Sequence, residues 1–174
     1  RMQLTPSQIR QDINCFGGFG RQGYGYTVSE LKDHIGKILG LDRQHRMIVI
    51  GAGNMGSAVA QYRSFIREGF EVEAMFDVDP AKVGTRLGNI PIFPMDDLEN
   101  YLQDHCIDVA VLTLPVTVAQ QTMDRVAACG VKAVWNFTPT DLQHSSETVV
   151  VNVHLSDSLQ ILSYKMAHMD SMKK

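Results

Sequence analysis

A glycine-rich turn between an apolar strand and a helix is the feature that most constrains this chain. The apolar run 47–50 leads directly into the sequence Gly-Ala-Gly-Asn-Met-Gly at 51–56. In a dinucleotide-binding fold, the first glycine permits a tight bend, the second lets the backbone approach a pyrophosphate, and the third lets the helix pack on the strand. The pyrophosphate then lies at a helix N-terminus, where free N–H groups favour an anion. The candidate phosphate-binding residues are Gly51, Ala52, Gly53, Asn54, Met55 and Gly56.

An acidic residue completes this pattern after the next strand. Asp77 ends the predicted strand 70–76 and lies 21 residues beyond Gly56. At about this distance, an acid in the same fold hydrogen-bonds the adenosine ribose. A carboxylate there favours NAD(H), because the 2′-phosphate of NADP(H) would meet a like charge. Strand, glycines, helix, strand and acid in this order therefore predict an NAD(H) site rather than a turn that is only structural.

Strands and helices alternate from residue 47 onward. Strands are predicted at 47–50, 70–76, 107–114, 132–137 and 148–153, with a short extended segment at 91–93. Helices are predicted at 54–68, near 96–104, at 116–129 and from 155 to about 168. This β-α-β alternation, with strands that are nearly continuous in Val, Ile and Leu, predicts an α/β fold with a Rossmann-like, doubly wound, mostly parallel sheet covered on both faces.

Two capped helices precede this alternation. Thr5 and Gln8 have capping-box spacing and predict a helix that continues through residue 13. Thr27 and Glu30 have the same spacing and predict a second helix that ends at residue 40. Between the two, residues 19–26 alternate aromatic and glycine positions, which is typical of a small hairpin.

Length and composition fit one full domain with a fragment of another. The chain has 174 residues, of which 44% are hydrophobic and 20% charged, and its net charge is −3. No apolar stretch reaches the ~18 to 20 residues that cross a bilayer, and the first residues form no signal-peptide core, so we expect a cytoplasmic protein without a membrane partner. Cys15, Cys106 and Cys129 lack metal-type spacing. We therefore expect buried, reduced thiols and no metal site.

Five motifs occur in an order that resembles one known family. They are Gln-Ile-Arg-Gln-Asp at 8–12, Phe-Gly-Gly-Phe-Gly-Arg-Gln-Gly-Tyr-Gly-Tyr at 16–26, Gly-Ala-Gly-Asn-Met-Gly-Ser-Ala at 51–58, Phe-Asp-Val-Asp at 76–79 and Asn-Phe-Thr-Pro at 136–139. Together they resemble the Rex family of bacterial redox-sensing transcriptional repressors over essentially the whole chain. The resemblance implies a homodimer with an N-terminal winged helix and a C-terminal Rossmann domain. Such a dimer binds an inverted-repeat operator when NAD⁺ predominates and releases it when NADH binds.

The resemblance divides the chain into four parts. These are a partial winged-helix DNA-binding domain (1–27), a linker helix and joint (28–46), a Rossmann NAD(H)-binding domain (47–153) and a C-terminal dimerisation helix (154–174). The operator-contacting residues that it implies are Ser7, Gln8, Arg10 and Gln11 of a recognition helix and Arg21 of a wing. Arginine and glutamine offer forked partners to base edges, and serine can bind a phosphate. Because the helices that would support the recognition helix do not precede it, we expect this chain to bind DNA poorly and assign operator binding to the intact protein.

The nicotinamide end of the site is expected at the carboxyl edge of the sheet, where such folds bind ligands. Candidate walls are Tyr62 on the first Rossmann helix, Leu114 and Pro115 at the end of one strand, and Asn136 and Phe137 at the end of another. Walls that are apolar around the ring favour NADH, because the oxidised ring carries a charge that is costly to bury. A sensor needs only two conformations that bind the ligand unequally, so no catalytic residue is expected.

The last predicted helix carries an apolar stripe. The stripe consists of Leu155, Leu159, Leu162 and Met166, and can either close the sheet or pack against a second subunit. The resemblance implies a homodimer through this helix, in one arrangement exchanged between the subunits. It also implies that His154 replaces an aspartate that, in relatives, pairs across the dimer with the tyrosine at the position of Tyr62. A surface histidine at a strand end is the simpler alternative.

Two other functions use a similar domain. An NAD-dependent oxidoreductase needs a proton donor beside the nicotinamide and room for a substrate, whereas the six histidines here are scattered and little chain remains for a substrate domain. A CoA-binding subunit of an acyl-CoA ligase would ordinarily lack both Asp77 and the phenylalanine-glycine segment 16–26. We therefore predict a repressor and not an enzyme.

Overall fold

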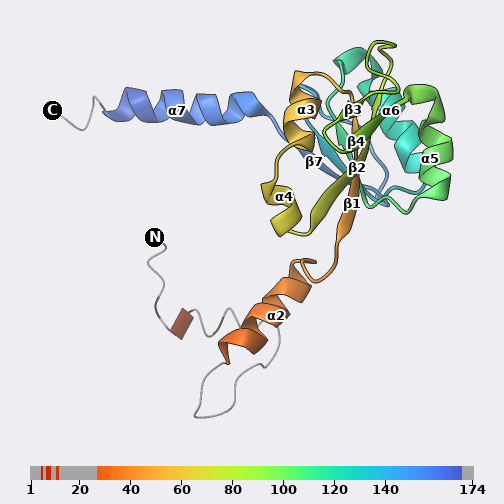
Figure 1. Cartoon of the computed structure of the whole chain (residues 1–174). Helices are drawn as coiled ribbons and strands as arrows, with labels where there is room; N and C mark the ends of the chain where they lie inside the picture. The colour runs from red at the N-terminus through yellow and green to blue at the C-terminus, as the bar shows by residue number, and fades with distance from the viewer. Residues whose placement is uncertain (1–4, 6, 9–10, 12–26, 170–174) are drawn as a thin grey trace. The chain divides into compact units, whose positions relative to one another are not determined.

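The computed structural model of the chain describes residues 5, 7–8, 11 and 27–169 (Figure 1). Its contacts divide the chain into two compact units, residues 1–44 and 45–174. Arg10, Arg21, Cys15 and the predicted hairpin 19–26 lie outside the described residues.

The longest helix among the described residues of the first unit is α2 (Val28–Ile38). Ahead of it, the capping box predicted at Thr5 is confirmed: the Thr5 N–H donates to Gln8 Oε1 at 2.9 Å, and the Gln8 N–H donates to Thr5 Oγ1 at 3.3 Å. The capping box predicted at Thr27 is wrong, because its hydroxyl caps no N–H of α2 among the described residues. There the helix begins on a backbone bond alone, from the Leu31 N–H to the Thr27 carbonyl at 3.0 Å.

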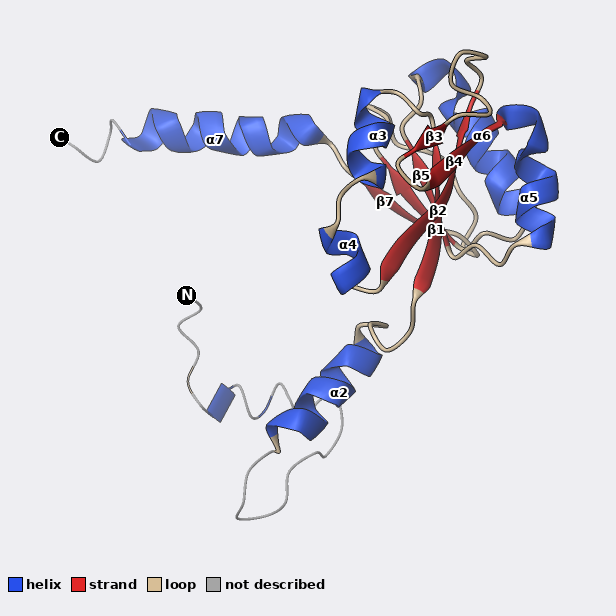
Figure 2. Cartoon of the chain, viewed as in Figure 1, coloured by secondary structure: helices blue, strands red, loops and turns tan. Residues whose placement is uncertain are grey.

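The second unit is built on a seven-stranded sheet in the order β3-β4-β2-β1-β5-β6-β7 (Figure 2). The strands are β1 (His45–Ile50), β2 (Phe70–Asp77), β3 (Arg86–Leu87), β4 (Ile90–Pro94), β5 (Val109–Leu112), β6 (Ala133–Asn136) and β7 (Val149–Asn152). Among the described strands, only β3 and β4 pair antiparallel. This arrangement confirms the predicted Rossmann-like fold. The two-residue strand β3 was not predicted, since it is too short to show a periodicity.

The register of the sheet brings the ends of four strands together. Ile50 pairs with Phe76 on one side and with Leu112 on the other, and Leu112 pairs with Asn136. The residues that follow these four positions therefore line one carboxyl edge of the sheet. In open α/β sheets this edge is where ligands bind.

Helices cover the two faces of the sheet unequally (Figures 1 and 2). They are α3 (Asn54–Ala60), α4 (Ser64–Arg67), the 3₁₀ helix η1 (Met95–Asp97), α5 (Leu98–Asp104) and α6 (Val116–Ala128). The last helix, α7 (Leu155–Met169), covers neither face and buries none of its residues. On one face, Leu98 of α5 and Met123 of α6 join a core with Phe76. On the other face, α3 contributes Val59 to a smaller core with Val49.

The first Rossmann helix differs from the prediction. A single helix was expected over 54–68, but the chain leaves the helix after Ala60 and re-enters it at Ser64. Tyr62 lies in this break, where its N–H bonds to the Val59 carbonyl at 3.1 Å. Helical spacing of apolar residues continues across the break, so periodicity could not reveal it. After the break, Phe65 of α4 packs edge-on against Trp135 of β6, with 5.5 Å between the ring centroids.

Smaller differences concern ends and exposure. β1 begins at His45, two residues earlier than predicted, and β5 and β6 are shorter than predicted. Cys106 is exposed, so the expectation of buried thiols is wrong for it, because it lies in the turn before β5. Among the described residues, no helix has the length and apolar character needed to span a bilayer.

Candidate functional site

The first glycine of the turn is required by the fold. Gly51 has φ +101°, a conformation that side chains disfavour, and its N–H donates to the Phe76 carbonyl at 2.8 Å. A Cβ at this position would lie 2.6 Å from the Thr113 carbonyl oxygen. The chain therefore bends directly against the end of β5, and only glycine fits.

The third glycine brings α3 onto the same turn. A Cβ at Gly56 would lie 1.9 Å from the Gly51 carbonyl oxygen. The hydroxyl of Thr113 donates to that same carbonyl at 2.8 Å and secures it from the β5 side. Sequence reasoning missed Thr113, although a hydroxyl directly after a strand at the ligand-binding edge could have suggested it.

The second glycine is different, because the chain's own packing does not require it. No described atom lies within 4 Å of a Cβ at Gly53, and the residue is exposed with an extended backbone at the start of α3. Asn54 and Met55 beside it are exposed as well, whereas Gly51 and Gly56 are buried. A glycine that leaves open space in the free chain is what close approach of a pyrophosphate needs.

Asp77 braces this turn from the end of β2. Its Oδ2 accepts the Ala52 N–H at 2.6 Å, and its Oδ1 accepts the Asp79 N–H at 2.9 Å. Lys82 Nζ lies 3.5 Å from Oδ2. Burial alone would raise the pKa of the Asp77 carboxyl, but the two N–H groups and the ammonium outweigh it, so the pKa lies below its ordinary value. Asp77 is therefore an anion held in place beside the glycine turn.

The residues predicted to surround the nicotinamide differ in how accessible they are. Leu114 is half-buried and Pro115, which precedes α6, is exposed. Asn136 is fully buried, and its amide donates to the Thr140 carbonyl at 2.7 Å and to Asn152 Oδ1 at 2.9 Å. The Asn136 side chain is therefore occupied within the chain, while its neighbour Phe137 is only half-buried.

Aromatic rings connect Phe137 to Tyr62 on the α3/α4 face. Phe137 packs against Trp135 at 4.6 Å, Trp135 against Phe65 at 5.5 Å, and Phe65 against Tyr62 at 4.8 Å between ring centroids. Tyr62 is 57% exposed. The sequence prediction included both ends of this series but neither Trp135 nor Phe65, whose contact depends on the break after α3.

His154 lies between two carboxylates of its own chain. Its Nε2 is 3.5 Å from Asp141 Oδ1, and its Nδ1 is 3.8 Å from Asp157 Oδ2. Asp141 Oδ1 also accepts the Asn152 amide at 2.8 Å. The histidine thus contacts the loop after β6 and the first turn of α7.

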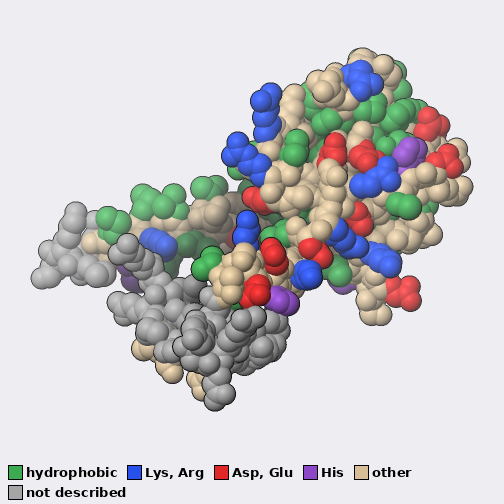
Figure 3. All heavy atoms as spheres, turned by 60° about the horizontal axis from the view of Figure 1, so that its bottom comes forward, with side chains coloured by type: hydrophobic (Ala, Val, Ile, Leu, Met, Phe, Trp, Pro, Cys, Tyr) green, Lys and Arg blue, Asp and Glu red, His purple; other side chains and the backbone are tan. Residues whose placement is uncertain are grey.

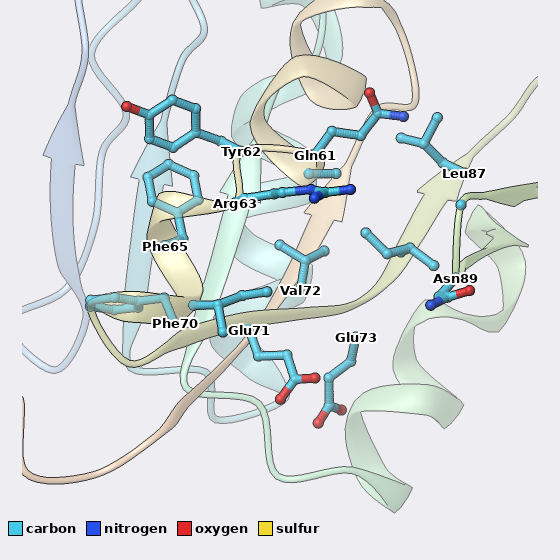
Figure 4. A pocket seen from close by; sticks show the side chains of 14 residues that line it. Gln61, Tyr62, Arg63, Phe65, Phe70, Glu71, Val72, Glu73, Leu87 and Asn89 are labelled. Atoms are coloured by element: carbon cyan, nitrogen blue, oxygen red, sulfur yellow. The ribbon is translucent and has the colours of Figure 1, made fainter.

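Two grooves flank α4 on the thinly covered face. One has a volume of about 800 Å³ and lies between the break after α3, β2 and the turn from β3 to β4; Figure 4 shows Arg63, Val72 and Leu87 around it. The other, of about 320 Å³, is almost entirely apolar and lies between Phe65 and the β6–β7 surface at Trp135. Neither groove is lined by the glycine turn, and Tyr62 is the one residue of the predicted cofactor site that lines the larger groove.

The exposed residues extend to both ends of the described chain. Ser7, Gln8 and Gln11 are exposed in the first unit. None of the fifteen residues of α7, all of them described, is buried, and Figure 3 shows hydrophobic side chains along this helix. Its exposed large apolar residues are Leu155, Leu159, Ile161, Leu162, Tyr164, Met166 and Met169.

Comparison with known proteins gives matches over part and over all of the chain. Residues 42–140 match the family model described as CoA binding domain, so this part belongs to that domain family. The redox-sensing transcriptional repressor Rex of Caldanaerobacter subterraneus subsp. tengcongensis is 45% identical over 174 residues, which are 100% of this chain and 78% of that protein. The repressor of the same name from Clostridioides difficile is 48% identical over 163 residues, which are 94% of this chain and 78% of that protein.

Solved structures agree with these relatives. The crystal structure of RSP in complex with beta-NAD⁺ and operator DNA has a TM-score of 0.88 at 44% identity and covers 98% of this chain and 78% of that chain. RSP in complex with beta-NADH has a TM-score of 0.84 at 41% identity, covering 98% and 79%. RSP is described as a Rex-family repressor. Since relatives at 45% and 48% identity align with all or nearly all of its residues, the chain belongs to the Rex family of redox-sensing transcriptional repressors.

Proposed function

We propose that this protein senses the ratio of NADH to NAD⁺ and represses transcription accordingly. It binds operator DNA while NAD⁺ predominates and leaves the operator when NADH binds. The observation that carries this proposal is the glycine turn, in which Gly51 and Gly56 are required by packing while Gly53 is left open. The RSP complexes with beta-NAD⁺, beta-NADH and operator DNA support the same ligands for this chain.

In the proposed site, the pyrophosphate lies on the turn formed by residues 51–56 and the adenosine ribose lies beside Asp77. The nicotinamide lies near Leu114, Pro115 and Phe137, with Tyr62 at the end of the aromatic series. Asn136 acts through its buried amide, which holds the shape of the loop that carries Phe137. Its own side chain is not offered to the ring.

Discrimination between the oxidation states follows from charge. The reduced ring is neutral and the oxidised ring is a cation, so half-buried apolar walls such as Leu114 and Phe137 favour NADH. A preference of about 100-fold corresponds to about 2.7 kcal/mol. That is sufficient to shift two conformations whose free energies differ by a similar amount.

The operator-binding surface belongs to the first unit. We assign Ser7, Gln8, Arg10 and Gln11 to major-groove contacts and Arg21 to the phosphate backbone or minor groove. The exposed positions of Ser7, Gln8 and Gln11 are compatible with these contacts. In this proposal residues 1–27 and 28–46 are the DNA-binding and linker parts, 47–153 the cofactor domain, and the protein works in the cytoplasm.

We assign homodimerisation to α7 within residues 154–174. A helix of fifteen residues is marginal in water when it stands alone, and α7 buries none of its residues within its own chain. The groove beside Trp135 is almost entirely apolar, and in this proposal a second copy of the chain covers it. A dimer would couple two cofactor sites to two DNA-binding units, as an inverted-repeat operator requires.

Calorimetric titration of the protein tests the sensor directly. NADH is expected to bind at least about ten-fold more tightly than NAD⁺, a difference of about 1.4 kcal/mol, and NADPH more weakly than NADH. CoA serves as a further titrant because residues 42–140 match the CoA binding domain model. Equal affinity for NADH and NAD⁺ would remove the basis of redox sensing, and binding of CoA alone would replace the proposed ligand.

A further inference from the structure

A lysine connects the two acidic residues beside the proposed ribose site. Lys82 Nζ lies 3.5 Å from Asp77 Oδ2 and 3.5 Å from Asp79 Oδ2. The side chain of Asp77 is only 10% exposed, whereas those of Lys82 and Asp79 are 38% and 42% exposed. The three groups therefore form one cluster with a buried and an open side, and its net charge is about −1 when all are ionised.

The turn that carries Lys82 is fixed by its own hydrogen bonds. The Lys82 N–H donates to the Asp79 carbonyl at 2.9 Å, and the Thr85 N–H donates to the Lys82 carbonyl at 3.0 Å. The Gly84 N–H donates to the Ile92 carbonyl of β4 at 2.9 Å, which attaches the turn to the sheet. The ammonium is thus presented by an anchored segment and not by a free surface chain.

Asp77 has little capacity left for a ligand. A carboxylate offers about four lone-pair positions. Here the N–H groups of Ala52 and Asp79 occupy one position on each oxygen, and Lys82 lies against the oxygen that Ala52 already uses. A ribose diol has two hydroxyls, so Asp77 alone cannot accept both. The second hydroxyl needs another partner, and Asp79 and Lys82 form the open side of the same cluster.

We propose that Lys82 is a specificity-determining residue that sets how strongly the site rejects a 2′-phosphate. This inference rests on the proposed NAD(H) site and assigns to a cluster what the sequence assigned to Asp77 alone. The ammonium partly neutralises the two carboxylates that a 2′-phosphate would meet. Without it, both carboxylates repel the phosphate, while a neutral 2′-hydroxyl is much less affected.

The test compares dissociation constants for NADH and NADPH in paired variants. Lys82→Met is expected to raise the ratio of the NADPH constant to the NADH constant by about ten-fold, because one compensating charge a few ångströms away is lost. Asp79→Asn, which removes a carboxylate and keeps Lys82, is expected to lower the same ratio. Shifts in opposite directions distinguish specificity from damage, since a damaged site would weaken both cofactors alike. Lys132→Met, at an exposed lysine just before the opposite end of β6, is the matched control and should leave the ratio unchanged.

Each outcome decides one question. If NADH does not bind the unaltered protein, the proposed function fails. If NADH binds and Lys82→Met leaves the ratio within about two-fold, a difference near 0.4 kcal/mol, the inference about Lys82 fails while the proposed function stands. If Lys82→Met prevents NADH binding altogether, Lys82 is required for cofactor binding as such, and the inference that it sets the specificity is overturned.

Discussion

The helices cover the two faces of the central sheet to different degrees. The α5/α6 face carries a core of fifteen buried residues, and α6 alone buries Ala119, Thr122, Met123 and Val126. The α3/α4 face has a core of seven, α3 buries only Gly56 and Val59, and α4 buries nothing. Alternate residues of each strand face opposite sides, and both sides of β1 are apolar, with Ile48 and Ile50 in one core and Met47 and Val49 in the other.

The contrast arises from the helices. α6 has thirteen residues, whereas α3 and α4 have seven and four and are separated by the break at Tyr62. Short helices cannot cover a wide sheet, and the two grooves beside α4 are the result. Helices α5 and α6 cover the first face, while the second face exposes apolar surface of the kind that marks an interaction site. The candidate cofactor site lies at the carboxyl edge of the sheet, between these two faces.

The largest effect on stability is expected in the larger core, on the α5/α6 face. Leu98→Ala removes a fully buried side chain from the α5/α6 face and should lower the free energy of unfolding by about 2–5 kcal/mol. Ile66→Ala on α4, where the side chain is 65% exposed, should change it by less than about 0.5 kcal/mol. Urea denaturation measures both. Similar losses of unfolding free energy in the two variants would contradict the difference between the two faces.

The glycine turn offers a sharper contrast at the edge between the faces. In Gly56→Ala, the new methyl group would collide with the Gly51 carbonyl, so we expect a loss of about 1–3 kcal/mol in stability together with weaker NADH binding. Gly53→Ala meets no described atom and should weaken NADH binding, while stability falls by at most about 1 kcal/mol because alanine is a poorer N-cap than glycine. Thermal unfolding and calorimetry separate the two. A stable Gly56→Ala with normal NADH binding would contradict this account of the turn.

Acid should weaken the same edge through Asp77. Its pKa is lower in the folded protein than in the unfolded chain, so the carboxylate contributes stability above the unfolded value, and that contribution disappears as pH falls through the folded value. We expect the unfolding free energy to decrease as pH falls from about 5 to below 4, and Asp77 contributes to this decrease. In Asp77→Asn this contribution should be missing at pH 7. If the pH profiles of the unaltered protein and of Asp77→Asn have the same shape and differ by a constant, Asp77 is not the source of the pH dependence.

The smallest effect on the fold concerns α7. Leu159→Glu alters an exposed side chain and should change the unfolding free energy of the Rossmann unit by less than about 0.5 kcal/mol. If α7 mediates the dimer, however, a buried charge in the interface should convert the protein to monomers in sedimentation equilibrium. Ser163→Glu, at an exposed position that is not apolar, is the control for added charge. A dimeric Leu159→Glu protein would exclude this position from the interface.

Local pattern was sufficient for the framework of the molecule. The order of strands and helices, the turn at Gly51 and Gly56 and the position of Asp77 after β2 follow from short-range spacing. Gly51 supplies a positive φ, and Gly56 avoids the Gly51 carbonyl five residues earlier. The family resemblance of the motifs is confirmed by the Rex relatives, and with it the prediction of a repressor and not an enzyme.

What pattern could not give depends on tertiary contacts. The break at Tyr62 is accompanied by the contact of Phe65 with Trp135 of β6, and the Asn136 amide is held by Asn152 of β7. The approach of Lys82 to Asp77 is set by a turn attached to β4, which the sequence left undefined. In each case residues that are distant in the chain, or uncommitted by periodicity, determine the site.

The position of Trp135 makes the cofactor end of the molecule observable by light. It is the single tryptophan of the chain, and its ring packs against Phe137, a predicted wall of the nicotinamide site. Tryptophan emission overlaps the absorption band of reduced nicotinamide, which the oxidised ring lacks. NADH should therefore quench the fluorescence of Trp135 by energy transfer, and NAD⁺ should not. The oxidation state of the bound cofactor would then be reported by the unlabelled protein itself.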